Sequence, residues 1–444
     1  MVASSNHKRV SRVGGKLFTQ ERTRFLADMQ SLKEVMRGNL LIFTIGDVLR
    51  QLSMFITFPY FSLYVVALGG SMVDIGIVNS LRPLTGLFLY PVAGYISDRY
   101  SKVKIIGYTG ILSTVLWSIF IFARDWRWIA VGNFLLGLLT FYFPASNALM
   151  ASSIPEDKRA LGYSLWLAIP MATGILSPLA GGYLISIWGV KAAMRFLYGL
   201  TFVVGLFIAF MNLKYLKEPP VKEYKNSLNL IGVLNESYGG MFEMLRWLPR
   251  NLKAFGLMLV LGFLLNNMVS SYWVIYATQS LGLEPIQWGM VLLIASVFNV
   301  VLMIPAGMLV DRMGPKRVLT WALLLGAVPM LLFRFATSFV YVTALLVVMT
   351  VANSFLMSGA PAYMTHSVPP ERRGRVMSAL GQGMLFINTR GGGGGGPGMG
   401  TLLTIPSIIG SVIGGFVYGY NPNLLWMSFG VALIMSSVIS DRFL

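Results

Sequence analysis

Two stretches of the chain carry the same pattern. Gly94–Lys104 reads GYISDRYSKVK and Gly307–Arg317 reads GMLVDRMGPKR, so a shift of 213 residues superposes them. The same shift brings Leu68-Gly69 onto Leu281-Gly282 and Gly76 onto Gly289. Agreement over so long a distance indicates that the chain contains two copies of one structural unit.

The composition is that of a membrane protein. Of the 444 residues 55% are hydrophobic and 12% are charged, whereas about a quarter of a soluble domain is charged. Cysteine is absent and only two histidines are present, which excludes disulfides, thiolate chemistry and an ordinary zinc or copper centre. We expect no metal and no cofactor.

Long apolar stretches divide the chain into membrane spans. A helix needs about 20 apolar residues to cross a bilayer core of about 30 Å. The sequence predicts twelve such helices in two sets of six, which is an all-α fold. The predicted spans are 40–68, 73–96, 104–123, 128–153, 161–188 and 192–213, followed by 254–281, 286–310, 317–337, 339–364, 401–420 and 424–440.

The basic residues set the orientation. Of 35 Lys and Arg residues, 28 fall in the two tails and in the loops that follow even-numbered spans, and five fall on the opposite side. Cytoplasmic loops carry such an excess, so both termini are expected in the cytoplasm. The net charge of +18 follows from this asymmetry, and we expect no nucleic acid partner.

The repeated stretch resembles motif A of the major facilitator superfamily. It occurs in both halves, in the loops after the second and the eighth span. The resemblance implies two six-helix bundles that alternate access to a central site, a design known from secondary transporters with parallel repeats. It also implies a conformational latch at the cytoplasmic face, made by Gly94, Asp98, Arg99, Gly307, Asp311 and Arg312.

A second, weaker resemblance points to the drug:proton antiporter branch of that family. In span 161–188 it rests on small residues and a proline that favour close helix packing, although Ser177 replaces a glycine of that motif. Phe58-Pro59-Tyr60 to Leu68-Gly69 is similar to the branch's first-helix motif, but Asn133 stands where the branch has an arginine. The packing residues are Gly174, Pro178, Gly181 and Gly182.

Three charged residues lie inside predicted spans. Asp47 and Arg50 are three residues apart, so they share a helix face and can pair, and Arg82 lies in the second span. Each intramembrane charge costs on the order of 2.5–3.5 kcal/mol unless it is paired or hydrated, and such groups usually mark a transport path. We therefore predict proton coupling at Asp47 and Arg50. A purely structural ion pair is the alternative.

The expected substrate cavity combines both halves. Span 40–68 and Arg82 would bring charge, whereas span 254–281 brings side-chain amides, hydroxyls and aromatic rings. Ordinary hydrogen bonds between helices are the alternative role for each polar residue. The predicted cavity residues are Gln51, Thr57, Phe58, Arg82, Asn266, Ser270, Trp273 and Tyr276, with Asn299, Asn353 and Ser354 as further contributors.

The predicted domains follow from these spans. An amphipathic cytoplasmic segment occupies 1–39, the first bundle 40–213, a cytoplasmic linker 214–253 and the second bundle 254–444. The second bundle contains an insertion of about twenty residues relative to the first, by alignment of the repeats. Its glycine-rich part, near 388–400, is expected to be cytoplasmic.

The sequence thus predicts a monomeric multi-pass protein of the cell membrane that moves a small organic solute. Proton-coupled export of amphipathic compounds is the leading expectation. Three alternatives stay open: an organic anion or organophosphate carrier that uses Arg50 and Arg82, a non-transporting receptor, and a lipid-moving protein. Substrate, protons and the lipid bilayer are the expected partners. No pair of nucleophile and base indicates an enzyme.

Overall fold

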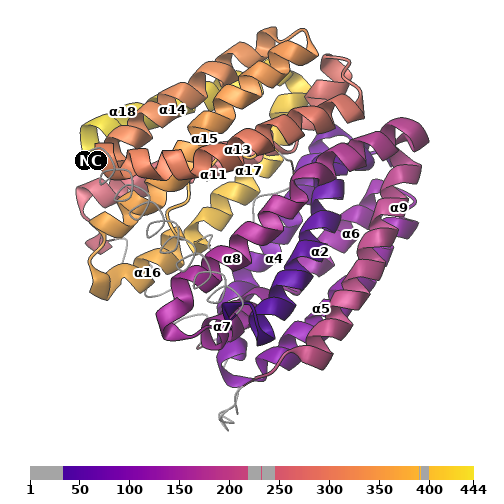
Figure 1. Cartoon of the computed structure of the whole chain (residues 1–444). Helices are drawn as coiled ribbons and strands as arrows, with labels where there is room; N and C mark the ends of the chain where they lie inside the picture. The colour runs from indigo at the N-terminus through magenta and orange to yellow at the C-terminus, as the bar shows by residue number, and fades with distance from the viewer. Residues whose placement is uncertain (1–33, 219–231, 233–245, 390, 392–399) are drawn as a thin grey trace, which may run out of the picture.

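The computed structural model describes residues 34–218, 232, 246–389, 391 and 400–444. Within these residues every regular element is helical. Figure 1 shows the helices of the first half, in indigo to magenta, packed as one bundle beside the orange to yellow helices of the second half.

The first bundle holds six passes. Three of them contain short interruptions, at Phe58–Tyr60 in the first, between Leu138 and Tyr142 in the fourth and at Gly174–Leu176 in the fifth. Ser71 starts the second pass with a capping box to Asp74, which satisfies free backbone N–H groups of that helix. The helices are α2 (Gly38–Thr57), α3 (Phe61–Ala67), α4 (Met72–Arg99), α5 (Lys102–Phe122), α6 (Trp126–Leu138), α7 (Tyr142–Ser153), α8 (Arg159–Thr173) and α9 (Ser177–Tyr215).

The second bundle repeats this order. Its helices are α11 (Arg250–Ser270), α12 (Trp273–Ile275), α13 (Pro285–Met313), α14 (Pro315–Leu332), α15 (Phe339–Ser367), α16 (Pro370–Leu380), α17 (Thr401–Tyr420) and α18 (Pro422–Phe443).

Eleven helices among the described residues are long and apolar enough to cross a membrane, and one of them covers Leu161–Tyr215. Its 55 residues are too many for one pass. Gly189 divides it, with φ 74° and ψ 163°, a left-handed conformation that only glycine adopts without strain. The two sides of Gly189 are the fifth and sixth passes, which gives the twelve predicted from the sequence.

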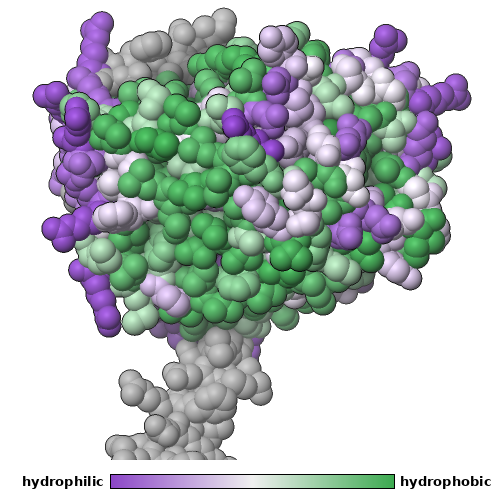
Figure 2. Space-filling view, turned by 90° about the horizontal axis from the view of Figure 1, so that it is seen from above, coloured by the Kyte–Doolittle hydropathy of each residue, from purple (hydrophilic) through white to green (hydrophobic). Residues whose placement is uncertain are grey.

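The hydropathy of the outer surface agrees with a protein that crosses the membrane. Figure 2 shows a broad hydrophobic face with hydrophilic residues gathered at its left and right edges. Large apolar side chains on this surface are strongly exposed, among them Phe122 (69%), Val340 (73%) and Ile304 (75%). Apolar exposure on that scale indicates contact with lipid. The protein is a multi-pass integral membrane protein.

The two bundles meet closely at one end, which we call the outer end; the cytoplasmic end is the one where α2 begins and α18 ends. At the outer end a Cβ on Gly182 would lie 2.4 Å from the carbonyl oxygen of Pro285, and one on Gly76 would lie 2.3 Å from that of Ser411. No side chain fits there. Hydrogen bonds also join the bundles, from Tyr272 Oη to Met72 O (3.0 Å).

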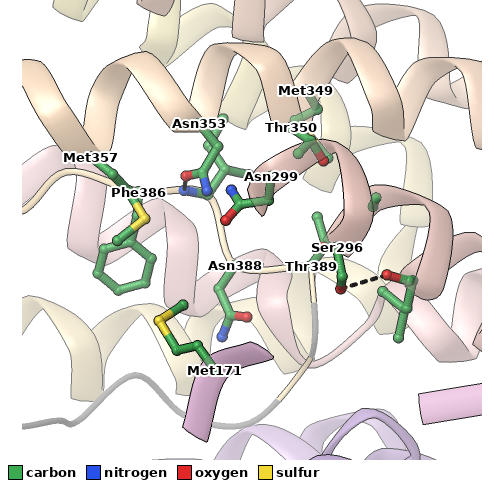
Figure 3. A pocket seen from close by; sticks show the side chains of 13 residues that line it. Met171, Ser296, Asn299, Met349, Thr350, Asn353, Met357, Phe386, Asn388 and Thr389 are labelled. Carbon is green, nitrogen blue, oxygen red and sulfur yellow. Dashed lines mark hydrogen bonds between the residues drawn. The ribbon is translucent and has the colours of Figure 1, made fainter. Parts of the chain in front are cut away.

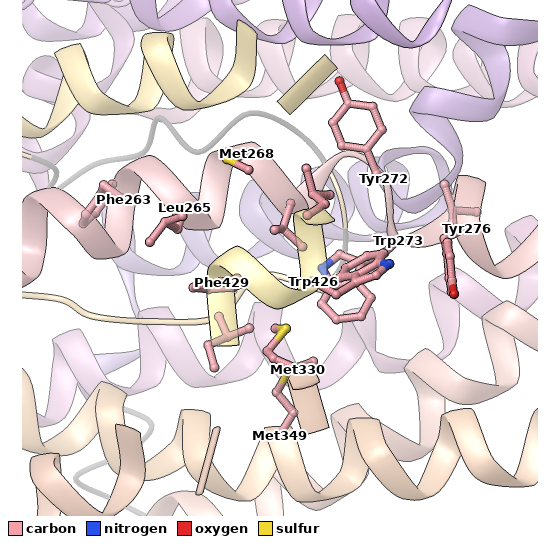
Figure 4. Packing of buried hydrophobic residues seen from close by; sticks show 14 of the residues in the cluster. Phe263, Leu265, Met268, Tyr272, Trp273, Tyr276, Met330, Met349, Trp426 and Phe429 are labelled. Carbon is pink, nitrogen blue, oxygen red and sulfur yellow. The ribbon is translucent and has the colours of Figure 1, made fainter. Parts of the chain in front are cut away.

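An aromatic cluster fills the outer half of the second bundle. Trp273 and Trp426 have ring centroids 4.4 Å apart, and Tyr276 and Phe333 pack against Trp426 (Figure 4). Trp273 and Trp426 are at most 1% exposed. Each such ring pair stabilises packing by about 0.5–1.5 kcal/mol beyond area burial. The cluster therefore holds α12 and α18 to the helical turn Phe333–Phe335 that follows α14.

The eleventh pass is interrupted. Residues 381–389 and 391 lie between α16 and α17 without regular structure. The sequence placed the part near 388–400 outside the membrane. The structure differs at residues 388, 389 and 391, which pack inside the bundle because side chains of α11, α12 and α15 bind the segment's backbone. Gly391 lies next to the first bundle, where a Cβ would be 3.2 Å from Phe58 O. Residues 390 and 392–399 fall outside the described residues.

Candidate functional site

A buried ion pair lies in the first bundle. Arg50 donates through Nη2 to Asp47 Oδ1 at 2.5 Å, the i, i+3 pairing that the spacing predicts. Trp166 of α8 donates through Nε1 to Asp47 Oδ2. Asp47 is 9% exposed, so both carboxylate oxygens are hydrogen-bonded in a nearly dry environment.

Arg50 has a second neighbour on the fourth pass. Its guanidinium carbon lies 5.1 Å from the ring centroid of Tyr142, a cation–π distance. The Arg50 side chain is 36% exposed, against 11% for Asp47. The arginine is therefore the member of the pair that solvent or a solute reaches first.

A small cavity of about 40 Å³ lies between α2, α4, α5, α6 and α9. Of the predicted cavity residues, Thr57, Phe58 and Arg82 line it. Arg82 makes no ion pair among the described residues, which distinguishes it from Arg50. The remaining lining residues are Met54, Phe61, Asn79, Trp117, Phe120, Asn133, Tyr198 and Thr201.

A larger cavity of about 200 Å³ lies mainly in the second bundle (Figure 3). Residues from the middle of α13 and α15 form two walls, the interrupted segment forms a third, and Met171 of α8 reaches it from the first bundle. None of the described lining residues is charged. They are Met171, Leu292, Ala295, Ser296, Asn299, Met349, Thr350, Asn353, Met357, Phe386, Ile387, Asn388 and Thr389.

Three of the predicted cavity residues of span 254–281 make structural contacts and line neither of these two cavities. Asn266 Oδ1 accepts from the backbone N of Asn388 at 2.7 Å, and Trp273 Nε1 donates to the backbone O of Asn388 at 3.1 Å. Tyr276 belongs to the aromatic cluster. Asn266 and Trp273 therefore position the cavity wall.

The other predicted cavity residues lie apart from both cavities' linings. Ser270 is 1% exposed at the end of α11. Gln51 packs beside Gly174, where a Cβ would lie 3.2 Å from Gln51 Cγ.

The motif A residues lie at the cytoplasmic end. Asp98, Asp311 and Arg312 are exposed, and neither aspartate forms an ion pair among the described residues. Arg99 stacks on the ring of Tyr95 at 3.5 Å. Gly94 and Gly307 have open space where a Cβ would lie. In this conformation, closed at the outer end, none of the ion pairs among the described residues joins the two motifs.

The small residues of the fifth pass lie against neighbouring helices. A Cβ on Gly181 would meet Ile56 O at 2.2 Å and one on Gly174 would meet Phe55 Cδ2 at 2.8 Å. Pro178 offers its carbonyl oxygen to Tyr60 Oη at 2.7 Å. With Gly182 against Pro285, this stretch brings the first, fifth and eighth passes together.

Sequence reasoning missed the contribution of Asn388 and Thr389. The signal that points to them is the insertion itself, because twenty extra residues inside a repeat must be accommodated somewhere. Trp166 was also missed, since its contact with Asp47 spans 119 residues of sequence.

Comparison with known proteins places the chain in a family. The model of the Major Facilitator Superfamily matches residues 43–252 and 254–440. The uncharacterized MFS-type transporter MJ1317 of Methanocaldococcus jannaschii is 22% identical over 411 residues, 90% of this chain and 94% of that protein. The multidrug resistance protein MdtG of Klebsiella pneumoniae is 27% identical over 181 residues, 39% of this chain and 44% of that protein.

A solved structure has the same fold. The crystal structure of a bacterial homologue of the iron transporter ferroportin in the inward-facing state superposes with a TM-score of 0.68, at 14% identity, over 92% of this chain and 99% of that one.

Proposed function

This chain belongs to the Major Facilitator Superfamily, and we propose that it is a secondary transporter that exports amphipathic organic compounds in exchange for protons. Transport would proceed by alternating access: the bundles part at the outer end as they close at the cytoplasmic end. The proposal draws its solute class from the antiporter-like residues of the fifth pass and from relatives such as MdtG, which is named for multidrug resistance.

The observation that carries the proton role is the bonding of Asp47. Its carboxylate is held by Arg50 and Trp166 in a nearly dry site. Protonation removes the negative charge, so a proton and the Arg50 ion pair compete for the same carboxylate. Such competition couples protonation to a rearrangement of Arg50, whose side chain is the more exposed member of the pair.

An organic anion carrier is the second candidate, and Arg82 supports it. Arg82 lines the smaller cavity with Phe58 and Trp117 and forms no ion pair among the described residues. A half-buried guanidinium without a carboxylate partner would bind an anionic group strongly.

Transport into proteoliposomes distinguishes the two candidates. A panel of amphipathic cations and anions on matched scaffolds is presented with and without an imposed pH gradient. The proposal expects accumulation that requires the gradient. Gradient-independent exchange restricted to anions would favour the second candidate, and transport of none of the compounds under either condition would contradict both.

A further inference from the structure

The interrupted eleventh pass builds a wall of the larger cavity out of polypeptide backbone. A backbone segment inside a membrane bundle must have its N–H and C=O groups satisfied. Asn353 Oδ1 accepts from Ile387 N at 2.8 Å, and Asn266 and Trp273 bind the N and O of Asn388. Three side chains from three helices thus fix the segment in one place.

Glycines allow the segment to turn into the cavity. Gly381 and Gly383 have φ values of 69° and 72°, which only glycine adopts without strain. Leu385 and Ile387 are each 5% exposed, so apolar anchors on the same segment pack into the bundle. Two features therefore fix the position of Asn388: the glycine turns that precede it and the hydrogen bonds to its own backbone.

Three carboxamides face this cavity. Figure 3 shows the side chains of Asn353, Asn299 and Asn388 one beneath another, with Met357 and Phe386 to one side and Ser296 to the other. All three asparagines are half-buried. Asn299 Nδ2 lies 3.4 Å from Ser354 Oγ, at the limit of a hydrogen bond, and Asn388 Nδ2 donates to Gly391 O at 3.0 Å.

The three carboxamides are uncharged, and each can both donate and accept hydrogen bonds. A carboxamide offers a donor and an acceptor but no charge. None of the described residues that line the cavity is ionisable, so a charged group placed among them would lose hydration without gaining a counter-ion from them. Methionine and phenylalanine beside the amides adapt to flat or irregular apolar shapes.

We infer that Asn299, Asn353 and Asn388 form a subsite for an uncharged hydrogen-bonding group, such as a carboxamide, on an apolar body. The inference deepens the proposed function and rests on it, because it names the part of the exported compound that the second bundle recognises. A charged group on the compound would instead be recognised outside this cavity, at Arg50 or Arg82.

Binding to the full chain in nanodiscs tests the subsite without any transport. The chain has no cysteine, so Met357→Cys provides a single reporter on the cavity wall for labelling by a maleimide. The probes are 2-naphthamide, 2-naphthoate and 2-naphthylmethylamine, which share one ring system and are neutral, anionic and cationic at pH 7. His366→Cys, exposed at the end of the same helix, is the control reporter that no probe should protect.

The amide is expected to protect Met357→Cys at a concentration at least five-fold lower than either charged probe. Asn299→Asp, which changes charge and not shape, should reverse this preference in favour of the amine. Asn353→Asp keeps the acceptor for Ile387 N and serves as the second variant. Asn251→Asp, whose carboxamide contacts Tyr363 outside the cavity, should leave the preference unchanged.

Equal protection by the naphthoate and the amide would overturn the inference, as would an unchanged preference in both aspartate variants. Failure of the proposed function gives a different result. Protection by the amide in a protein that transports nothing would leave the subsite in place and contradict transport.

Discussion

The hydroxyl of Tyr60 donates to the carbonyl oxygen of Pro178 at 2.7 Å. The same hydroxyl lies 3.2 Å from the carbonyl oxygen of Pro285 in the other bundle, and Tyr60 is fully buried. One side chain of the first pass therefore joins the fifth pass to the eighth, at the place where Gly182 and Gly289 let the bundles touch. We therefore expect this contact to stabilise the closed outer end.

Tyr60→Phe should weaken that closure. The substitution removes the hydroxyl that donates to Pro178 O and contacts Pro285 O. Loss of one such hydrogen bond costs about 1 kcal/mol, which is a change of about five-fold in the ratio of the two conformations. Spin-label distances between Arg124→Cys and Thr337→Cys, in outer loops of opposite bundles, would show the added open population. Tyr64→Phe loses an equally short hydrogen bond, to Phe120 O within the first bundle, and should leave those distances unchanged. The same shift in both variants would refute a specific role of Tyr60.

Gly182→Ala should open the outer end by sterics. Its Cβ would lie 2.4 Å from Pro285 O, and that backbone atom moves only with its helix. Overpacking of this kind costs about 1–3 kcal/mol. Only the closed conformation is destabilised, because the two bundles part at this end in the open one. The same pair of spin labels reports the result. Gly199→Ala, on the sixth pass, is the control, because its Cβ would meet nothing within 4 Å. An unaltered distance distribution in Gly182→Ala would contradict the packing argument.

The motif A aspartates should set the balance at the cytoplasmic end. They form no ion pair among the described residues in this conformation, so a latch made by Asp98 or Asp311 would stabilise the other conformation. Asp98→Asn and Asp311→Asn should then raise the population that is open to the cytoplasm, read from labels at Glu156→Cys and Glu371→Cys. Asp441→Asn applies the same change outside the motifs. If Asp98→Asn and Asp311→Asn both give the same label distances as Asp441→Asn, these residues form no latch.

Glu218 should make the stability of the first bundle depend on pH. Burial raises the pKa of Glu218, but hydrogen bonds from Ser101, Lys102 N and Val103 N, together with the Lys102 ammonium, outweigh it and leave the pKa below its ordinary value. A lowered folded-state pKa adds stability above the unfolded value of about 4.3, and that stability is lost as the pH falls through the folded pKa.

Glu218→Gln should therefore reduce the free energy of unfolding at pH 7 by about 1 kcal/mol, the usual contribution of an N-terminal cap. Thermal unfolding in detergent should show the difference from the unaltered protein shrinking below about pH 4. Glu156→Gln is the control, since its partner Arg159 lies at 3.2 Å and its side chain is 87% exposed, where ion pairs contribute little. A difference that grows toward acid pH would contradict the assignment.

The sequence predicts most of the fold because the membrane restricts it. Span 286–310 corresponds to Pro285–Met313 and span 339–364 to Phe339–Ser367, since apolar length and capping residues define such helices. The Asp47–Arg50 pair was also predictable, because i, i+3 neighbours on one helix meet whatever surrounds them.

The cavity was less predictable because it depends on how helices rotate against one another. Trp273 and Tyr276 have the residue types of a binding site, yet both side chains pack in the interior beside Trp426. Asn388 lies in a segment without periodicity, and its place is set by Asn266 and Trp273, more than 100 residues away in the sequence.

Proton-driven accumulation by Asp47→Asn tests the account most directly. The asparagine keeps a side-chain oxygen for Trp166 Nε1 but cannot be ionised, and Asp157→Asn, an exposed carboxylate at the cytoplasmic end, is the matched control. In proteoliposomes with an acidic lumen, supplied with the compound that the unaltered protein accumulates best, Asp47→Asn should show no uptake against the gradient while downhill exchange continues. Uptake by Asp47→Asn to the level of the Asp157→Asn control, with the same dependence on pH, would contradict the account.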